Sequence, residues 1–146
     1  MATVELGART SGRHAALQML FAIDGARGVD VESVIRAYWR EFDFDPVGRE
    51  YADSIVRGTV THLVRTDEMI RLASTNWRLE RMARVDRNVL RLATYELLEQ
   101  CDVPRAVVLD EAVELAKLFG SEDSGAFVNG VLDRVAEELG RVDHDK

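Results

Sequence analysis

The sequence predicts an all-α fold, and three observations support this. Apolar residues recur at three- and four-residue spacing along almost the whole chain, and alternating β-branched runs are few. The 146 residues include only two prolines, so few positions interrupt a helical pattern. A chain of this length can bury a hydrophobic core without disulfides or metal. We therefore expect one compact bundle of about seven helices.

The first two helices are predicted from their ends and their apolar stripes. Ser11 is expected to cap a helix that ends near Gly25 and Gly28. Asp30 is expected to cap a second helix, which has the clearest helical stripe in the chain. The inward-facing residues of the two helices are Ala16, Leu17, Leu20 and Phe21, then Val31, Val34, Ile35, Tyr38, Trp39 and Phe42.

The next two helices are predicted from their first residues. Asp45 and Pro46 have the form of an N-cap followed by proline at the first helical position, where its missing N–H costs nothing. The inner face of that helix would comprise Val47, Tyr51, Ile55, Gly58, His62 and Leu63. Thr66 is followed by two acids that suit the positive end of a helix dipole. It predicts a new, short helix that runs through Leu72.

The second half of the chain predicts three helices. Residues 82–100 carry an apolar stripe too wide for a surface helix, so we expect the central helix of the core there. Pro104 ends it, because proline disfavours helical geometry in the preceding residue. A further helix should run to Gly120, placed for a left-handed stop. Asp123 or Ser124 should cap the last helix.

The chain is expected to form a single domain over residues 1–146, because it has no internal repeat, long linker or low-complexity block. Residues 1–10 and 141–146 are expected to be flexible. The start of the chain lacks the pattern of a signal peptide, and no apolar stretch approaches membrane-spanning length. Cys101, the single cysteine, has no partner for an internal disulfide. These features predict a cytoplasmic protein without membrane contact.

Charge and motifs limit the possible functions. The formal net charge of -7 argues against a basic surface for indiscriminate nucleic-acid binding, so any RNA site must be local. No cysteine pair, HExxH, P-loop or GxSxG string is present, and the three histidines lie far apart in the sequence. We therefore expect a protein that is not an enzyme and that needs no cofactor or metal.

Four residues are candidates for contact with RNA. Arg9 and Arg13 flank a Thr-Ser-Gly helix start, where cations and free helix amides could hold phosphate. Such arginines are also common as solubilising charge. Phe21 lies at the margin of its apolar stripe and could stack on an unpaired base, with core packing as the alternative. Phe127, beside the polar EDSGA loop, has the same two interpretations.

Three stretches resemble the NusB family: RHAALQMLF, VDRNVLRLATYELLEQCDVP and VVLDEAVELAKLFGSEDSGAFVNGVLD, together covering about residues 11–139. The resemblance implies a compact bundle of about seven helices in two layers, which agrees with the helix count above. It also implies a transcription antitermination factor that pairs with NusE, the small-subunit ribosomal protein ten. Such a factor binds boxA-type RNA in the RNA polymerase antitermination complex, chiefly on ribosomal RNA operons.

The resemblance also assigns roles to individual residues. The positions that it implies for RNA contact are Arg9, Arg13, Phe21 and Phe127. The positions that it implies for the NusE-binding face are Asp86 and Asp123. The family's continuous arginine run is interrupted here, and Gly125-Ala126 replaces a basic position, so fewer phosphate contacts should form. We expect weak RNA binding with shallow salt dependence by the isolated chain, and appreciable binding only beside NusE.

Two alternatives remain open at this stage. NusB-like domains also precede methyltransferase domains, but this chain has no glycine-rich cofactor loop after a strand. The second alternative is a protein-binding or homodimerising NusB-like module with reduced RNA binding. An apolar Phe21 exposed at the margin of its helix would favour that alternative.

Overall fold

The structure is a computed structural model that describes residues 7–26, 28–42 and 46–141. These residues form seven α-helices and one 3-10 helix, and they contain no strand. The elements are α1 (Ala8–Asp24), α2 (Val31–Glu41), α3 (Pro46–Thr61), α4 (Leu63–Ala73), η1 (Leu79–Arg81), α5 (Arg84–Glu99), α6 (Arg105–Phe119) and α7 (Ser124–Glu138). The predicted all-α bundle of about seven helices is confirmed.

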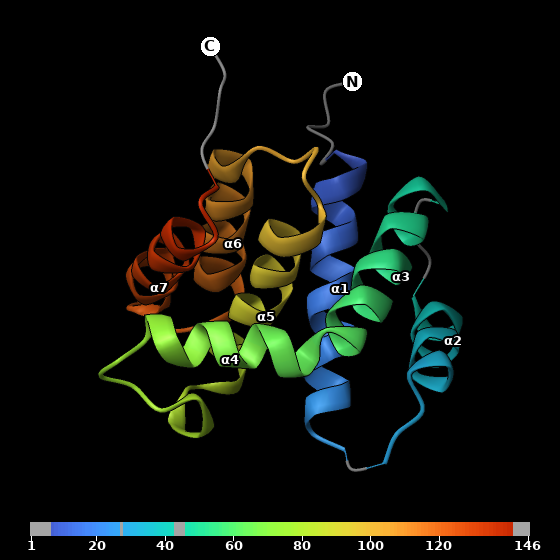
Figure 1. Ribbon diagram of the computed structural model, residues 1–146. Helices are drawn as coiled ribbons and strands as arrows, with labels where there is room; N and C mark the ends of the chain where they lie inside the picture. Colours follow the sequence, from blue (N-terminus) through green and yellow to red (C-terminus); the bar gives the residue numbers. More distant parts are fainter. Residues whose placement is uncertain (1–6, 27, 43–45, 142–146) are drawn as a thin grey trace.

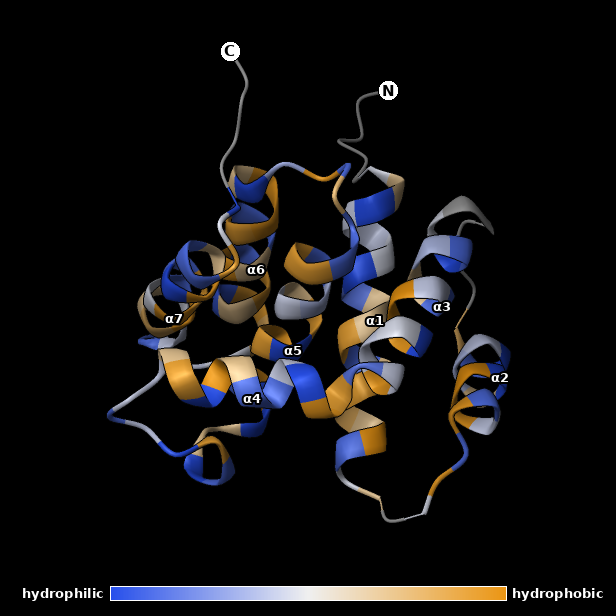
Figure 2. Ribbon diagram, in the orientation of Figure 1, coloured by the Kyte–Doolittle hydropathy of each residue, from blue (hydrophilic) through white to orange (hydrophobic). Residues whose placement is uncertain are grey.

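Helix α5 lies at the centre of the bundle and packs against α1, α3, α4, α6 and α7 (Figure 1). Val89, Leu90 and Leu92 of α5 are almost completely buried, as its wide apolar stripe predicts. Helices α1 and α3 pack on one side of α5, whereas α6 and α7 pack together on the other. Hydrophobic residues recur along each helix and supply the core between these layers (Figure 2).

Helices α1 and α3 approach each other unusually closely near their first turns. A Cβ atom added at Gly12 would lie 2.8 Å from the carbonyl oxygen of Gly48. Glycine at position 12 therefore lets two backbones meet where any side chain would separate them. The result is that the starts of α1 and α3 lie side by side, which positions one end of the candidate site.

The starts of the first three helices agree with the sequence predictions to different degrees. Asp30 caps α2 as predicted, because its carboxylate accepts a hydrogen bond from the backbone N–H of Ser33. The prediction for Ser11 is wrong, since α1 already begins at Ala8. The N–H of Ser11 donates to the carbonyl of Gly7, which places Ser11 inside the helix. Helix α3 begins with a proline as predicted, while its expected cap at position 45 lies outside the described residues.

Two other boundary predictions are corrected by the backbone. Thr66 does not start a helix, because its N–H donates to the carbonyl of His62 within a helix that begins at Leu63. Gly120 ends α6 in an extended conformation, with φ of -104° instead of a left-handed value. The left-handed stop occurs at Gly140, whose φ is +67°.

The chain ends differ in part from the expectation of flexibility. Residues 8–10 belong to α1, and the guanidinium of Arg141 donates hydrogen bonds to the carbonyls of Leu97 and Val103. Residues 1–6 and 142–146, on which the rest of that expectation falls, lie outside the described residues. Among the described residues, no helix is long and apolar enough to cross a membrane.

Candidate functional site

Helices α1 and α5 run antiparallel and are tied together at both ends by ion pairs. Near the start of α1, Arg13 contacts Glu96 at 2.8 Å, and near its end Asp24 contacts Arg87 at 2.7 Å. Two of the predicted RNA-contact residues, Arg9 and Phe21, therefore lie at opposite ends of a helix whose position is fixed. Arg9 and Phe21 are separated by twelve residues, or about 18 Å of helix at about 1.5 Å per residue.

The tie at the end of α1 depends on a carboxylate with several donors. Asp24 accepts hydrogen bonds from the side chains of Arg87 and Asn88, and Arg91 lies within 3.4 Å of it. Burial alone would raise the pKa of the Asp24 carboxyl, but these hydrogen bonds and the two guanidinium charges lower it below its usual value. The end of α1 is therefore anchored to the start of α5.

The tie at the start of α1 is a buried cluster around Arg13. The guanidinium donates through Nε and Nη2 to the two carboxylate oxygens of Glu96, and through Nη1 to Glu111 at 3.3 Å. The hydroxyl of Tyr51 donates to the same Glu96 carboxylate. Burial, followed by the charge of Glu96, raises the pKa of the Tyr51 hydroxyl above its usual value. Each charged group of this cluster already has a partner inside the protein.

The structure places Arg13 differently from its predicted RNA contact. Its side chain is only 3% exposed, and the neighbouring Glu96 side chain is 2% exposed. A phosphate could reach this guanidinium only if the bidentate pair opened. In the present arrangement Arg13 positions the start of α1 against α5, and its expected phosphate contact is replaced by an internal one.

Arg9 is the accessible cation at this end of α1. Its side chain is 48% exposed, lies over the ring of Tyr51 at 4.8 Å and pairs with the exposed Asp102 at 3.1 Å. Gly7, the N-cap residue of α1, supplies no side-chain cap, and the first turn of the helix contains no acid. The first-turn amides and Arg9 together form a cationic corner that suits an anion.

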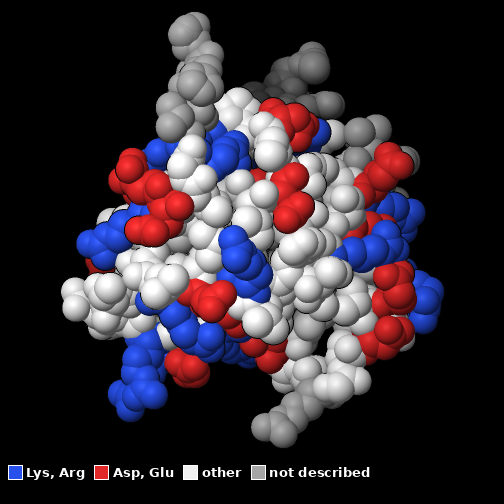
Figure 3. Space-filling view, in the orientation of Figure 1, with Lys and Arg blue, Asp and Glu red and all other residues white. Residues whose placement is uncertain are grey.

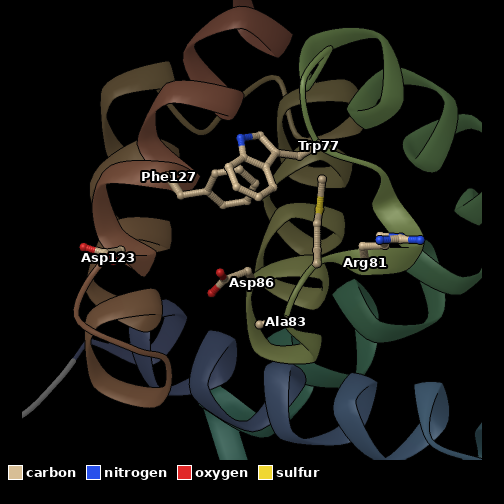
Figure 4. A pocket seen from close by; sticks show the side chains of 7 residues that line it. Trp77, Arg81, Ala83, Asp86, Asp123 and Phe127 are labelled. Carbon is tan, nitrogen blue, oxygen red and sulfur yellow. The ribbon is translucent and has the colours of Figure 1, made fainter.

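At the opposite end of the molecule, one pocket of about 260 Å³ joins three of the predicted residues. Asp86 in the first turn of α5, Asp123 before α7 and Phe127 on α7 all line it (Figure 4). The ring of Phe127 meets the ring of Trp77 edge to face, at 6.0 Å between centroids. Trp77 is itself 62% exposed, so the pocket has an aromatic wall that is open to solvent.

The carboxylate of Asp86 lies below these two rings in Figure 4. The residue is 9% exposed, and its buried Oδ1 atom has no hydrogen-bond partner among the described residues. A buried oxygen of this kind is costly unless a donor reaches it. The combination of a carboxylate with two aromatic faces suits a cationic group, such as a lysine or arginine side chain.

Phe21 lines a second pocket, of about 200 Å³, on the other side of the α5 start. Val85 lines this pocket, whereas its neighbour Asp86 lines the first one. The guanidinium of Arg84 lies 4.0 Å above the Phe21 ring and donates to the carbonyl of Phe21. The ring is half-buried and one face is covered by the Arg84 cation, so packing occupies part of the ring and its contact with RNA stays a prediction.

Trp77, Arg81 and Arg84 are site residues that the sequence analysis missed. They belong to the WRLERMAR segment around η1, where Figure 3 shows basic side chains gathered at one corner. Trp77 interrupts the helical periodicity after α4, and three arginines follow it within seven residues. An aromatic outside any apolar stripe and next to a basic run is the signal that could have identified this corner.

Comparison with known proteins decides the family. The NusB family pattern matches residues 10–137. The chain belongs to the NusB family. A relative from Sorangium cellulosum (strain So ce56), Transcription antitermination protein NusB, is 64% identical over 97% of this chain and 100% of its own length.

Solved NusB structures share the fold. T. maritima NusB is 41% identical, with a TM-score of 0.82 over 92% of this chain and 94% of that one. A crystal structure of antitermination factors NusB and NusE in complex with dsRNA contains a chain that is 28% identical, with a TM-score of 0.82 over 90% of this chain and 97% of that one. The NusB match includes every predicted site residue except Arg9, which lies one residue before it.

Proposed function

We propose that this chain is a cytoplasmic transcription antitermination factor that works by binding and not by catalysis. It pairs with NusE and binds boxA-type RNA in the RNA polymerase antitermination complex, chiefly on ribosomal RNA operons. The name shared by its curated relatives and the NusB–NusE complex with dsRNA among its structural neighbours support this proposal.

The observation that carries the proposal is that one pocket joins residues assigned to the two ligands. Asp86 and Asp123 are the candidates for NusE, whereas Phe127 is a candidate for RNA, and all three line the same 260 Å³ space. A protein partner that occupies the acidic side of this pocket therefore comes next to a base stacked on its aromatic side. This arrangement supports joint binding of the two ligands.

The RNA surface would extend from this pocket towards Arg9. Trp77 and Phe127 offer rings on which an unpaired base can stack, and Arg81 lines the same pocket. Arg9 and the first-turn amides of α1 offer a phosphate site at the far end. Arg13 belongs to this surface as a positioning residue, because it orients the helix start from inside.

Charge explains why the partner should help RNA to bind. The carboxylates of Asp86 and Asp123 repel a phosphate that approaches Phe127, by roughly 0.7 kcal/mol for a like-charge pair about 6 Å apart in a water-exposed site. A cationic side chain of NusE beside Asp86 would cancel part of this repulsion and also supply the donor that Oδ1 lacks. Weak RNA binding by the isolated chain follows from the same argument.

Fluorescence anisotropy with labelled boxA-type RNA, with and without NusE, tests this proposal. Asp86→Asn should weaken NusE binding and raise RNA affinity of the isolated chain a few-fold. Phe127→Ala should weaken RNA binding about tenfold, at roughly 1–3 kcal/mol per stacked base, and weaken NusE binding less than Asp86→Asn does. Asp110→Asn on the exposed face of α6 is the control for loss of one negative charge.

Two results would contradict the proposal. One is wild-type chain that binds neither NusE nor RNA when both are supplied together. The other is a stable homodimer, detected by light scattering, that does not dissociate when NusE and RNA are added. The second result would favour the homodimerising module with reduced RNA binding.

A further inference from the structure

A second cationic surface lies between α2 and α3, outside the two pockets described above. It is a groove of about 650 Å³, here called the α2–α3 groove. Four arginines and two carboxylates line it, which gives a local net charge of +2 on a chain whose total is -7. In Figure 3, blue and red side chains lie together over these two helices. A local positive surface on an acidic protein indicates an anionic ligand.

The two carboxylates of the groove are already engaged by other groups. Arg57 donates through Nε and Nη2 to both oxygens of Glu32, at 2.7 and 2.8 Å. Asp53 accepts a hydrogen bond from the indole N–H of Trp39 at 2.7 Å. The other three arginines of the groove have no carboxylate within ion-pair distance among the described residues. They are Arg36, Arg40 and Arg49.

Arg49 is held in an orientation that suits phosphate. Its guanidinium carbon lies 4.7 Å from the centre of the Trp39 ring, so the cation rests on the aromatic face. A guanidinium stacked in this way keeps its N–H edges available for the paired oxygens of a phosphate. Arg36 and Arg40 lie on α2 across the groove, and both are exposed.

The groove shares helix α3 with the proposed RNA surface. Helix α3 packs against α1 and also against α2. Tyr51, which carries the Arg9 guanidinium on its ring, follows Arg49 by only two residues in α3. Because residues two apart on a helix point to different sides, Tyr51 faces α1 whereas Arg49 faces α2, and an RNA strand that leaves Arg9 would cross the first turns of α3 to reach Arg49. An acidic peptide could also satisfy the arginines, but it would lack this connection to a neighbouring phosphate site.

We propose that the α2–α3 groove binds the phosphodiester backbone of the RNA that continues beyond the boxA-type element. This inference depends on the proposed function, because it extends the RNA path of the same complex. It assigns to Arg36, Arg40 and Arg49 a contact that is independent of base sequence. The groove would lengthen the bound RNA and increase the salt dependence of binding.

The test compares two RNA lengths with the chain bound to NusE. One RNA holds the boxA-type element alone, and the other carries about ten further nucleotides of mixed sequence on each side. Arg36→Ser/Arg40→Ser should leave affinity for the short RNA unchanged and lower affinity for the long RNA roughly tenfold at low salt. The slope of log affinity against log salt should fall by about 1.4, at about 0.7 per phosphate contact.

Arg65→Ser/Arg71→Ser removes the same charge from exposed positions of α4 and serves as the matched control. The proposal is supported if only the α2 variant loses the advantage of the long RNA. It is overturned if both variants lose it equally, if neither does, or if the α2 variant loses NusE binding instead. Failure of wild-type complex to bind even the short RNA would refute the proposed function, whereas tight binding of the short RNA without any gain from the flanks would refute only this inference.

Discussion

Replacing Arg13 with methionine should destabilise the protein far more than it changes RNA contact. The Arg13 and Glu96 side chains are 3% and 2% exposed, and the substitution leaves the Glu96 carboxylate with the Tyr51 hydroxyl as its hydrogen-bond donor. Removing one partner of a buried ion pair costs about 3–5 kcal/mol. The whole free energy of unfolding of such a domain is about 5–15 kcal/mol. A single substitution should therefore remove a large part of the stability.

Urea unfolding followed by circular dichroism at 222 nm measures this loss. Glu96→Gln and the double variant complete a mutant cycle, and the double variant should lose about 0.5–3 kcal/mol less than the sum of the single losses, since the two side chains interact directly. Arg9→Met is the control, because its exposed pair with Asp102 should be worth about 1 kcal/mol or less. If Arg13→Met costs as little as Arg9→Met and yet abolishes RNA binding, Arg13 is an RNA ligand and the internal role is wrong.

Two further predictions concern stability. Gly12→Ala should lower the free energy of unfolding by about 1–3 kcal/mol, because the added Cβ would meet the Gly48 carbonyl oxygen at 2.8 Å; Gly130→Ala, with open space around it in α7, should instead raise it by about 1 kcal/mol in the same urea titration. The Asp24 carboxyl has a folded pKa below its unfolded value, so its contribution is present above about pH 4 and is lost as the pH falls through the folded pKa. The stability difference between wild type and Asp24→Asn, measured by the same urea titration, should therefore shrink from pH 7 towards pH 2; a difference independent of pH would contradict the assignment.

Helical periodicity was sufficient to predict the fold but not every helix start. Apolar spacing reports which face of a helix is buried, and this face is set by the whole core. A cap depends on one or two side chains, and several can compete. Ser11 and Thr66 have suitable side chains, but in each case the helix extends one turn further back, to Ala8 and Leu63. Asp30 was correctly predicted, because α2 follows a break at Gly28 with positive φ.

The site was predictable only where a local motif carried it. Asp123 and Phe127 are four residues apart in one motif, and only the resemblance placed Asp86, 37 residues before Asp123, beside them in one pocket. The burial of Arg13 depends on Glu96, which lies 83 residues away in sequence. A contact of this kind arises from the antiparallel packing of α1 on α5, and periodicity does not report which charged residues that packing brings together.

The length of α1 determines what size of ligand can use the whole proposed surface. Arg9 and the Phe21 region are about 18 Å apart along the helix, and both ends of the helix are fixed to α5 by ion pairs. At about 3.4 Å of axial rise per nucleotide in a stacked strand, this distance corresponds to about five nucleotides. A mononucleotide cannot touch both ends, whereas a single RNA strand can. The two ion pairs, Arg13–Glu96 and Asp24–Arg87, therefore hold the ends of α1 at a fixed distance from each other. A variant that breaks one of these pairs should weaken the binding of long RNA more than the binding of short RNA, even though no contact with the ligand is removed.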